Sequence, residues 1–282
     1  MFPIRSAHRL APSIVELTIE APLVARKRKP GNFVMVRLDG TGERIPLTIV
    51  DSDEQTITLI VQAVGKTTHA LCSLSSGDAV RDLVGPLGTP TPIKYYGDVA
   101  CIGGGVGTAE LYPIAQALKE AGNRVHTMIG GRTRELVILE EKMRQYSDTL
   151  QVTTDDGSYG RKGLVTDALR TLLERGTPLQ AVYAIGPMPM MKAVAEVTRE
   201  PAIHTVVSLN TIMVDGTGMC GGCRVSVGGQ MKFACVDGPE FDAHAVDFEE
   251  LIMRSRTYAS QERVAYENHL CRLAEAGKDG ER

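Results

Sequence analysis

The sequence predicts an antiparallel β domain followed by an α/β domain, with a small cysteine-bearing segment and a helical tail at the C-terminus. Short apolar runs separated by Gly, Asp and Pro fill the first third, and strand and helix patterns alternate from about residue 98. Three of the six cysteines lie between residues 220 and 235. We expect a β-barrel over residues 1–95, a parallel-sheet domain over 96–207, and the cysteine segment with its helix over 208–282.

Composition points to a soluble protein with ordinary cores. A chain of 282 residues is long enough for two or three domains, and 43% hydrophobic with 23% charged residues is typical of globular proteins. The formal net charge of −3 argues against a nucleic-acid partner, which would favour a basic surface. Apolar runs stay well below the roughly 18 residues that span a bilayer, and the N-terminus lacks a signal-peptide pattern. We therefore expect a cytoplasmic protein with no membrane partner.

The cysteines need another role than disulfide bonding, because disulfides are rare in the cytoplasm. They are buried thiols, redox thiols or ligands. Cys72, Cys101 and Cys271 stand alone in the sequence and are each predicted to be a small buried hydrophobe.

The first third reads as antiparallel β structure. SIVELTIEA, residues 13–21, alternates apolar and polar residues as a half-buried strand does. Several short strands at regular spacing favour a small barrel or sandwich. Further strands are expected at 33–40, 45–53, 56–65 and 78–88, with a short helix near 66–74.

From residue 98 the periodicity changes to that of a parallel α/β sheet. The apolar strand DVACIGGG precedes a helix over 108–122, in which apolar residues recur at helical spacing up to the stop at Gly122. Strand and helix then alternate, which implies a parallel sheet with helices on both faces. Strands are expected at 125–131, 150–157, 181–187 and 203–210, helices at 134–146, 163–176 and 188–200, and a helical tail over 248–277.

GGGVGT, residues 103–108, lies between a predicted strand and a helix. Glycines there let a pyrophosphate approach the backbone and the helix N-terminus. The match to G-x-G-x-x-G is imperfect, because Thr108 stands where the third glycine belongs. A tight strand-to-helix turn remains the alternative. TDDGS at 154–158 and Gly186–Pro187 also follow strands, so three polar or glycine-rich strand ends would converge on one crevice.

Two short stretches of the β domain are candidates for a phosphate or ring contact. RIPLT, residues 44–48, places Arg44 between two β runs and Thr48 at a strand start. VGKTT spans residues 64–68. On spacing alone, the favoured interpretations are that Arg44 is a surface arginine beside a strand and that VGKTT is a simple turn.

The cysteine segment reads Asp-x4-Cys-x2-Cys-x11-Cys, from Asp215 through Cys220 and Cys223 to Cys235. Plant-type [2Fe–2S] ferredoxins use Cys-x4-Cys-x2-Cys with a distant fourth cysteine, so Asp215 stands where the first cysteine belongs. Glycines permit a sharply folded loop, and Cys235 follows a predicted hairpin whose strands are RVSV and MKFA. Zinc, three buried thiols, or Asp215 as a non-ligand are the competing interpretations. The glycines expected to shape the loop are Gly216, Gly218, Gly221 and Gly222, with Gly228 and Gly229 in the hairpin turn.

Taken together, these motifs resemble the ferredoxin–NADP reductase superfamily. The carrying residues are R-x-P-L-T, a G-x-T-T turn, GGGVGTAELYP and GPMPMM. The C-terminal phrase SLNTIMVDGTGMCGGCRVSVGGQMKFACVDGPEFDAH narrows the resemblance to two related electron-transfer subunits. One serves dihydroorotate dehydrogenase. The other, which it resembles more closely, is the small subunit of NADH-dependent ferredoxin:NADP oxidoreductase, also described as the sulfide dehydrogenase β subunit.

The resemblance implies three cofactor sites. FAD would be held by Arg44, Pro46, Leu47 and Thr48, with Thr48 in the catalytic position near the flavin N5, and touched by Val61, Gly65, Thr67 and Thr68. NAD(H), with NADP(H) as the alternative, would bind Gly103, Gly104, Gly105, Val106, Gly107, Thr108, Asp155, Asp156, Gly157, Gly186 and Pro187. The [2Fe–2S] cluster would be ligated by Asp215, Cys220, Cys223 and Cys235. One departure is Ile185, where many superfamily members have a cysteine.

Cofactor chemistry orders these sites. A nicotinamide transfers two electrons as hydride, an iron–sulfur cluster moves one, and a flavin does both. We therefore expect electrons to pass between NAD(H), FAD and the cluster, and then to a partner docking near residues 210–260. By resemblance the partner is a larger flavin and iron–sulfur subunit, in a bifurcating complex that couples NAD(H), NADP(H) and ferredoxin.

Two other functions stay open. The dihydroorotate dehydrogenase electron-transfer subunit is the first, although Asp215 in place of a cysteine argues against it. A non-catalytic redox sensor or scaffold is the second. Arg132 and Arg134 would suit a 2′-phosphate, whereas the resemblance favours NAD.

Overall fold

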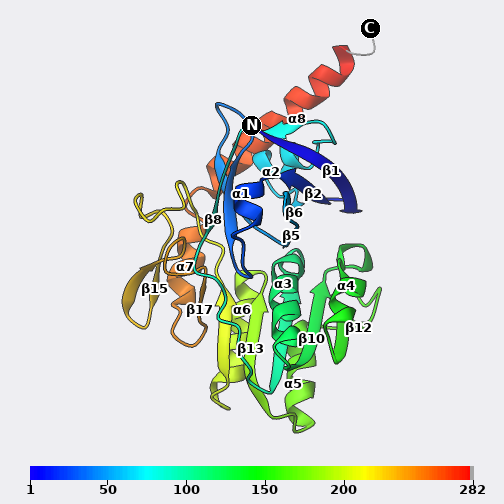
Figure 1. Cartoon of the computed structure of the whole chain (residues 1–282), viewed down its shortest axis with the longest axis vertical. Helices are drawn as coiled ribbons and strands as arrows, with labels where there is room; N and C mark the ends of the chain where they lie inside the picture. Colours follow the sequence, from blue (N-terminus) through cyan, green and yellow to red (C-terminus); the bar gives the residue numbers. More distant parts are fainter. Residues whose placement is uncertain (280–282) are drawn as a thin grey trace.

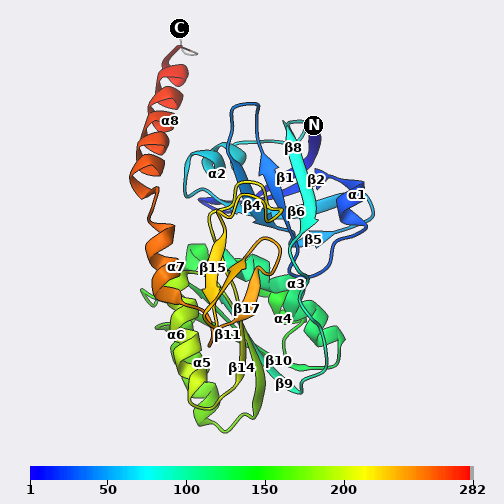
Figure 2. The ribbon, with the colours of Figure 1, turned by 90° about the vertical axis from the view of Figure 1, so that its left-hand side faces the viewer.

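The computed structural model of the chain describes residues 1–279, with side chains for residues 1–271. The β domain and the α/β domain lie one above the other, and the C-terminal helix runs alongside the β domain (Figures 1 and 2). The predicted order of an antiparallel β domain, a parallel-sheet domain and a C-terminal segment with helices is confirmed.

The β domain consists of two antiparallel sheets, with strand orders β5-β6-β2-β1-β7 and β4-β3-β8. Its core includes Leu17, Ile19, Ile57 and Leu59, which the alternating strands turn inward. The elements are β1 (Phe2–Ala11), β2 (Ile14–Glu20), α1 (Pro22–Ala25), β3 (Phe33–Arg37), β4 (Arg44–Thr48), β5 (Asp51–Ser52), β6 (Thr56–Gln62), α2 (Lys66–Leu71), β7 (Ala79–Val80) and β8 (Asp82–Leu87).

The α/β domain is built on one sheet with the order β12-β11-β10-β9-β13-β14-β17. Its strands pair in parallel except for β17, which runs antiparallel to β14. Helices α3 and α4 pack on one face, and α5 and α6 on the other. The elements are β9 (Asp98–Gly104), α3 (Gly107–Glu120), β10 (Arg124–Gly131), the 3-10 helix η1 (Arg134–Leu136), α4 (Glu140–Gln145), β11 (Thr149–Thr154), β12 (Arg161–Lys162), α5 (Val165–Glu174), β13 (Leu179–Ile185), α6 (Met188–Arg199), β14 (His204–Ser208) and β17 (Glu240–Asp242).

The prediction of a single helix over 134–146 is wrong. The segment forms the short η1 and then α4, and Leu139 between them takes a left-handed conformation with φ of 58°. A helix cannot continue through such a residue, so the chain restarts at Glu140.

The C-terminal segment forms a hairpin and two helices, and it also completes the large sheet. Gly228 and Gly229 turn the hairpin as the sequence predicts. The helical tail is divided, because the chain forms turns at 256–258. Cys72 and Cys101 are buried as expected, whereas Cys271 on the last helix is exposed, which corrects that prediction. The elements are β15 (Arg224–Val227), β16 (Gln230–Phe233), α7 (Phe248–Ser255) and α8 (Ala259–Asp279).

Among residues 1–279, helices with the length and apolarity required to cross a membrane are absent.

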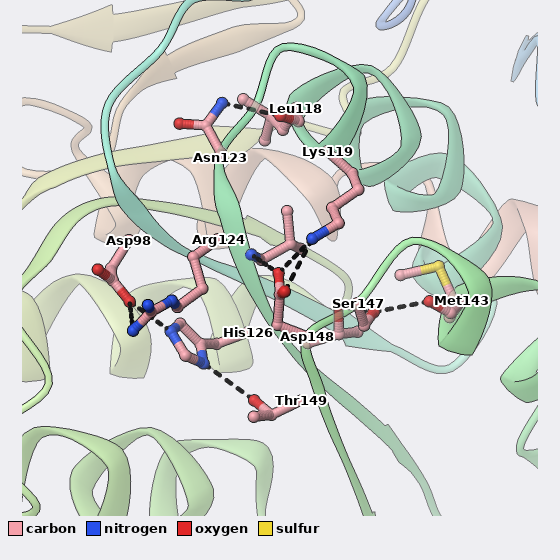
Figure 3. A network of polar contacts seen from close by, with 12 residues as sticks. Asp98, Leu118, Lys119, Asn123, Arg124, His126, Met143, Ser147, Asp148 and Thr149 are labelled. Atoms are coloured by element: carbon pink, nitrogen blue, oxygen red, sulfur yellow. Dashed lines mark hydrogen bonds and ion pairs between the residues drawn. The ribbon is translucent and has the colours of Figure 1, made fainter.

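Polar contacts stabilise the amino ends of the central strands (Figure 3). His126 lies between Asp98, at 2.8 Å, and Thr149, at 2.9 Å. Asp148 accepts from the Lys119 ammonium at 2.7 Å and from the Val125 amide at 2.8 Å. Because Asp98 begins β9, this network lies at the edge of the sheet opposite the glycine loop, and we assign it a structural role.

An apolar contact fixes the β domain on the α/β domain. Ile14 and Ile60 of the β domain belong to the same buried cluster as Leu111 and Tyr112 of α3. Ile14 is 0% exposed. This contact sets where the end of β4 lies relative to the start of α3.

We predict that Ile14→Ala destabilises the protein by about 2–5 kcal/mol, because a cavity forms where the two domains meet. The measurement is chemical unfolding followed by circular dichroism. Leu23→Ala is the control, since Leu23 is 76% exposed and should change stability little. An Ile14→Ala unfolding curve that overlays the wild-type curve would contradict this account of the domain contact.

Candidate functional site

The glycine loop joins β9 to α3 at the carboxyl edge of the sheet. Gly105 has φ of +57°, and its amide donates to the Gly130 carbonyl at 2.7 Å. A Cβ atom on Gly107 would overlap the Ile185 carbonyl and come within 2.8 Å of the Gly186 Cα. The close approach of helix to strand, which the third glycine of the motif usually allows, is therefore made by Gly107. This explains why Thr108, which is buried, is tolerated one residue later.

The other predicted strand ends lie at the same edge. A Cβ atom on Gly186 would lie 3.1 Å from the Gly104 Cα, so the Gly186–Pro187 turn directly faces the glycine loop. On the other side, the Asp155 amide donates to the Gly131 carbonyl at 3.1 Å. The structure thus brings together the ends of β11, β10, β9 and β13, which suits a long ligand with a phosphate-bearing middle.

The Asp155–Gly157 turn is ordered by its own hydrogen bonds. The Asp156 carboxylate accepts from the amide of Ser158 at 2.9 Å and from its hydroxyl at 2.7 Å. These bonds lower the pKa of Asp156. Gly157 takes φ of +78°, which a glycine adopts without strain.

Strand β4 contains the RIPLT motif and lies at the edge of the three-stranded sheet. Arg44 is exposed, whereas Pro46, Leu47 and Thr48 are half-buried. A strand with apolar residues between a guanidinium and a hydroxyl fits a flat ring with a pyrophosphate tail. Pro46 is tolerated here because an edge strand does not need every amide donor.

The G-x-T-T turn lies beside this strand. The Thr67 hydroxyl donates to Glu43 at 2.8 Å, which ties α2 to the start of β4. Thr68 accepts from the Gly65 amide at 3.0 Å and caps the helix. Val61, which is also predicted to touch the flavin, is 1% exposed, and its side chain lies in the barrel core.

Glu110 is a functional candidate that sequence reasoning missed. It lies in the first turn of α3, and the Thr48 side chain is near enough to influence its carboxyl group. Burial raises the pKa of Glu110 to about 7, although part of the residue remains exposed. In sequence the residue looks like an ordinary first-turn acid, and only the packing of the two domains reveals its contact.

The cysteine loop is shaped by glycines and by Asp215. Gly216, Gly218 and Gly221 have positive φ. Asp215 accepts from the Thr217 amide at 2.6 Å and from the Cys220 amide at 2.8 Å. The Thr217 bond above all lowers the pKa of Asp215 to about 2. The aspartate therefore caps the loop, and its role as an iron ligand stays a prediction.

The three thiols lie on the cysteine loop and on the hairpin that follows it. Cys223 and Cys235 are buried with sulfurs 3.2 Å apart, whereas Cys220 is exposed on the loop above them. The Gly222 amide donates to the Cys220 sulfur at 3.4 Å. Among residues 1–279, side chains of His, Cys, Asp and Glu do not converge in threes on a single ion. Free thiols with an amide donor to sulfur fit an iron–sulfur cluster.

The cysteine loop packs against the strand next to β4. A Cβ atom on Gly216 would lie 2.7 Å from Met35 and 2.8 Å from Leu87. Met35 is the pairing partner of Pro46. In Figure 2 the yellow loop lies across this side of the β domain. The RIPLT strand therefore has the glycine loop at its end and the cysteine loop one strand away.

This two-domain arrangement with a cysteine-bearing extension defines an oxidoreductase of the ferredoxin-reductase fold. Family models agree with each part: an oxidoreductase NAD-binding domain matches residues 101–196, and the iron–sulfur cluster binding domain of dihydroorotate dehydrogenase B matches residues 210–247. The chain belongs to the family of dihydroorotate dehydrogenase B electron-transfer subunits and their homologues.

The relatives cover nearly the whole chain. A dihydroorotate dehydrogenase B electron transfer subunit homolog from Thermotoga maritima is 49% identical, with 93% of each chain covered. The electron transfer subunit from Bacillus caldolyticus is 35% identical over 86% of this chain and 96% of its own. A solved structure described as NADH-dependent reduced ferredoxin-NADP oxidoreductase, in a study of flavin-based electron bifurcation, has 47% identity and a TM-score of 0.91, covering 96% of this chain and 98% of that one. A cytochrome P450 reductase from Amycolatopsis, at 21% identity and a TM-score of 0.62 over 72% of this chain and 68% of its own, shares the fold.

These comparisons support the cofactors that the sequence predicts, which are NAD(H), FAD and a [2Fe–2S] cluster. The residues that hold each of them remain predictions, and two variants test them.

We predict that Gly107→Ala reduces the rate of flavin reduction by NADH by about 100-fold, because the added methyl displaces the glycine loop from the Ile185–Gly186 turn. Stopped-flow absorbance measures this rate. Gly40→Ala is the control, since its methyl would meet only the end of the Arg81 side chain. A wild-type rate of flavin reduction in Gly107→Ala would show that the glycine loop is not part of the nucleotide site.

Asp215→Cys tests the fourth ligand. If Asp215 binds iron, exchanging carboxylate for thiolate changes the donor set, and both the electron paramagnetic resonance spectrum and the midpoint potential of the cluster should shift. Asp237→Asn is the control, because Asp237 likewise caps a turn, at the Phe233 amide. A spectrum and midpoint identical to wild type would show that Asp215 only shapes the loop.

Proposed function

We propose that this chain is the electron-transfer subunit that passes electrons between NAD(H), FAD and a [2Fe–2S] cluster to a larger flavin and iron–sulfur partner. The relatives named above support a subunit role. The similarity to the bifurcating ferredoxin-NADP oxidoreductase structure favours a complex that couples NAD(H), NADP(H) and ferredoxin.

The position of β4 is the observation that supports this order of transfer. At its end Thr48 lies near Glu110, two residues beyond the predicted nucleotide loop. Along its side Met35, the partner of Pro46, touches Gly216 of the cysteine loop. A flavin held on β4 would therefore lie between a hydride donor and a one-electron acceptor.

The chain's own residues would position each group. Bound flavin supplies the exchange between hydride and single-electron chemistry. Arg44 and the α2 turn would hold its pyrophosphate, and Thr48 would hydrogen-bond to the ring. The glycine loop and the Gly186–Pro187 turn would orient the nicotinamide by position alone, since the residue before that turn is the apolar Ile185.

An exposed apolar rim marks where the partner would dock. Met219 is 88% exposed, Val214 53% and Val236 43%, and all three surround the cysteine loop. Apolar side chains gathered around an exposed redox loop are typical of a surface that another subunit covers. Partner binding here would exclude water from the cluster and shorten the transfer distance.

Dihydroorotate dehydrogenase is the second candidate system. The family model for residues 210–247 and the Bacillus caldolyticus subunit both favour it. The two candidates use different partners, so the identity of the co-purifying subunit decides between them.

We predict that the chain purified alone oxidises NADH with an artificial acceptor such as ferricyanide but does not reduce NADP with reduced ferredoxin. Adding the co-purified larger subunit should restore that reaction. The measurements are visible absorbance and electron paramagnetic resonance of the isolated chain, and NADPH formation in the complex. Full NADP reduction by the isolated chain would contradict the subunit role. Orotate formation by the complex would assign it to the second system, and a cluster without flavin would favour a redox sensor.

A further inference from the structure

We propose that Arg224 and Arg254 raise the redox potential of the [2Fe–2S] cluster by holding the two peptide groups that lie between Cys220 and Cys223. The inference rests on the predicted ligation of the cluster by these two cysteines. It assigns a positioning role to two arginines that lie outside the predicted ligand set.

Each arginine binds one carbonyl of the Gly221–Gly222 pair. The Arg224 guanidinium donates to the Gly221 carbonyl at 3.2 Å. The Arg254 guanidinium donates to the Gly222 carbonyl, also at 3.2 Å. Hydrogen bonds with a charged partner are roughly twice as strong as those between neutral groups. Two consecutive peptide groups of the cysteine loop are therefore held by cationic donors.

The first of these contacts acts on a sulfur through a single peptide group. The carbonyl of the peptide between Gly221 and Gly222 accepts from Arg224. The amide of the same peptide donates to the Cys220 sulfur at 3.4 Å. Hydrogen bonds that share a peptide group polarise one another, so the cation at the carbonyl strengthens the amide donor at the sulfur.

The second contact comes from a fixed helix. Arg254 lies in the last turn of α7, and Phe248 and Leu251 of this helix are buried in one apolar cluster with Val225 of β15. Figure 2 shows α7 beside β15. A cavity of about 20 Å³ is lined by residues of both the helix and the loop, including Leu251, Arg254 and Gly222. Because packing is incomplete there, the guanidinium bond links the anchored helix to the loop.

The charge of both arginines acts in the same direction as their hydrogen bonds. A carbonyl is a neutral acceptor, so neither contact cancels the positive charge of the guanidinium. Reduction adds one negative charge to a cluster, and nearby positive charge favours that form. Hydrogen bonds to the sulfurs and net charge are among the factors that set the potential of an iron–sulfur cluster. The two arginines should therefore make the cluster a better acceptor of electrons.

A purely structural role for Arg254 is the alternative, because cations are favoured in the last turn of a helix. Such a role would change the stability of the protein and leave the potential of the cluster unchanged. The midpoint potential therefore separates the two roles.

The test is an anaerobic potentiometric titration of the full chain, with its flavin and cluster, followed by electron paramagnetic resonance of the reduced cluster. Arg224→Met and Arg254→Met remove the charge and the donors but keep a long side chain. Each substitution should shift the reduction equilibrium about tenfold towards the oxidised cluster, which lowers the midpoint by about 59 mV for a one-electron couple.

Arg256→Met is the matched control, because it removes the same charge two positions beyond Arg254. Arg256 is exposed, and its backbone amide caps the end of α7. Its midpoint should equal that of wild type. Iron and labile sulfide are measured in every variant. Because Arg224 is exposed, Arg224→Met should fold normally, and it decides the test if Arg254→Met does not retain a cluster.

The outcomes separate this proposal from the proposed function. Wild-type midpoints in Arg224→Met and Arg254→Met, at full cluster content, would overturn the role of the arginines and leave the order of transfer intact. An equal fall in Arg256→Met would overturn it as well, because any charge nearby would then suffice. A wild-type chain without labile sulfide would overturn the proposed function, and this inference with it.

Discussion

The pairing of β4 with β3 is the contact on which the rest of the site depends. Through Met35, β3 holds the cysteine loop, and through Thr48, β4 meets the first turn of α3. Each of these contacts joins a different part of the chain to a two-strand unit in the β domain. A flavin bound on that unit, as proposed, would need no moving domain to meet the glycine loop and the cysteine loop, because the positions of both loops are set by strand register and apolar packing.

Regular local patterns made much of the fold predictable. Alternating residues identified the strands of the β core, the strand and helix alternation identified the parallel sheet, and Gly228–Gly229 identified the hairpin. Strand β1 had no such pattern, because most of its side chains are exposed or half-buried and charged residues interrupt it. Only Ile4 and Ala11 of this strand are buried in the core. Strand β17 is three residues long and exists because β14 offers an edge to pair with.

The site was predictable where function depends on the backbone and unpredictable where it depends on contacts between domains. The glycine loop, the Gly186–Pro187 turn and the cysteine loop can be recognised in the sequence by their glycines, which a strained or crowded backbone requires. Glu110 shows no such sign, because its neighbour Thr48 lies sixty-two positions earlier and in another domain. Val61 illustrates the converse: a motif position points to a ligand, while burial places the side chain in the core.

The C-terminal segment packs against both domains and is not a separate module. Its strand β17 extends the α/β sheet, its loop packs on Met35 and Leu87 of the β domain, and its helix α8 lies against α2, where the Tyr266 ring is 5.9 Å from that of His69. Each contact alone would leave the cysteines free to shift relative to one domain. Together they hold the cysteine loop beside the β4–β3 pair and keep α2, which begins in the G-x-T-T turn, in place. Glu110 lies at the start of α3, where the two domains meet, and burial there raises its pKa to about 7.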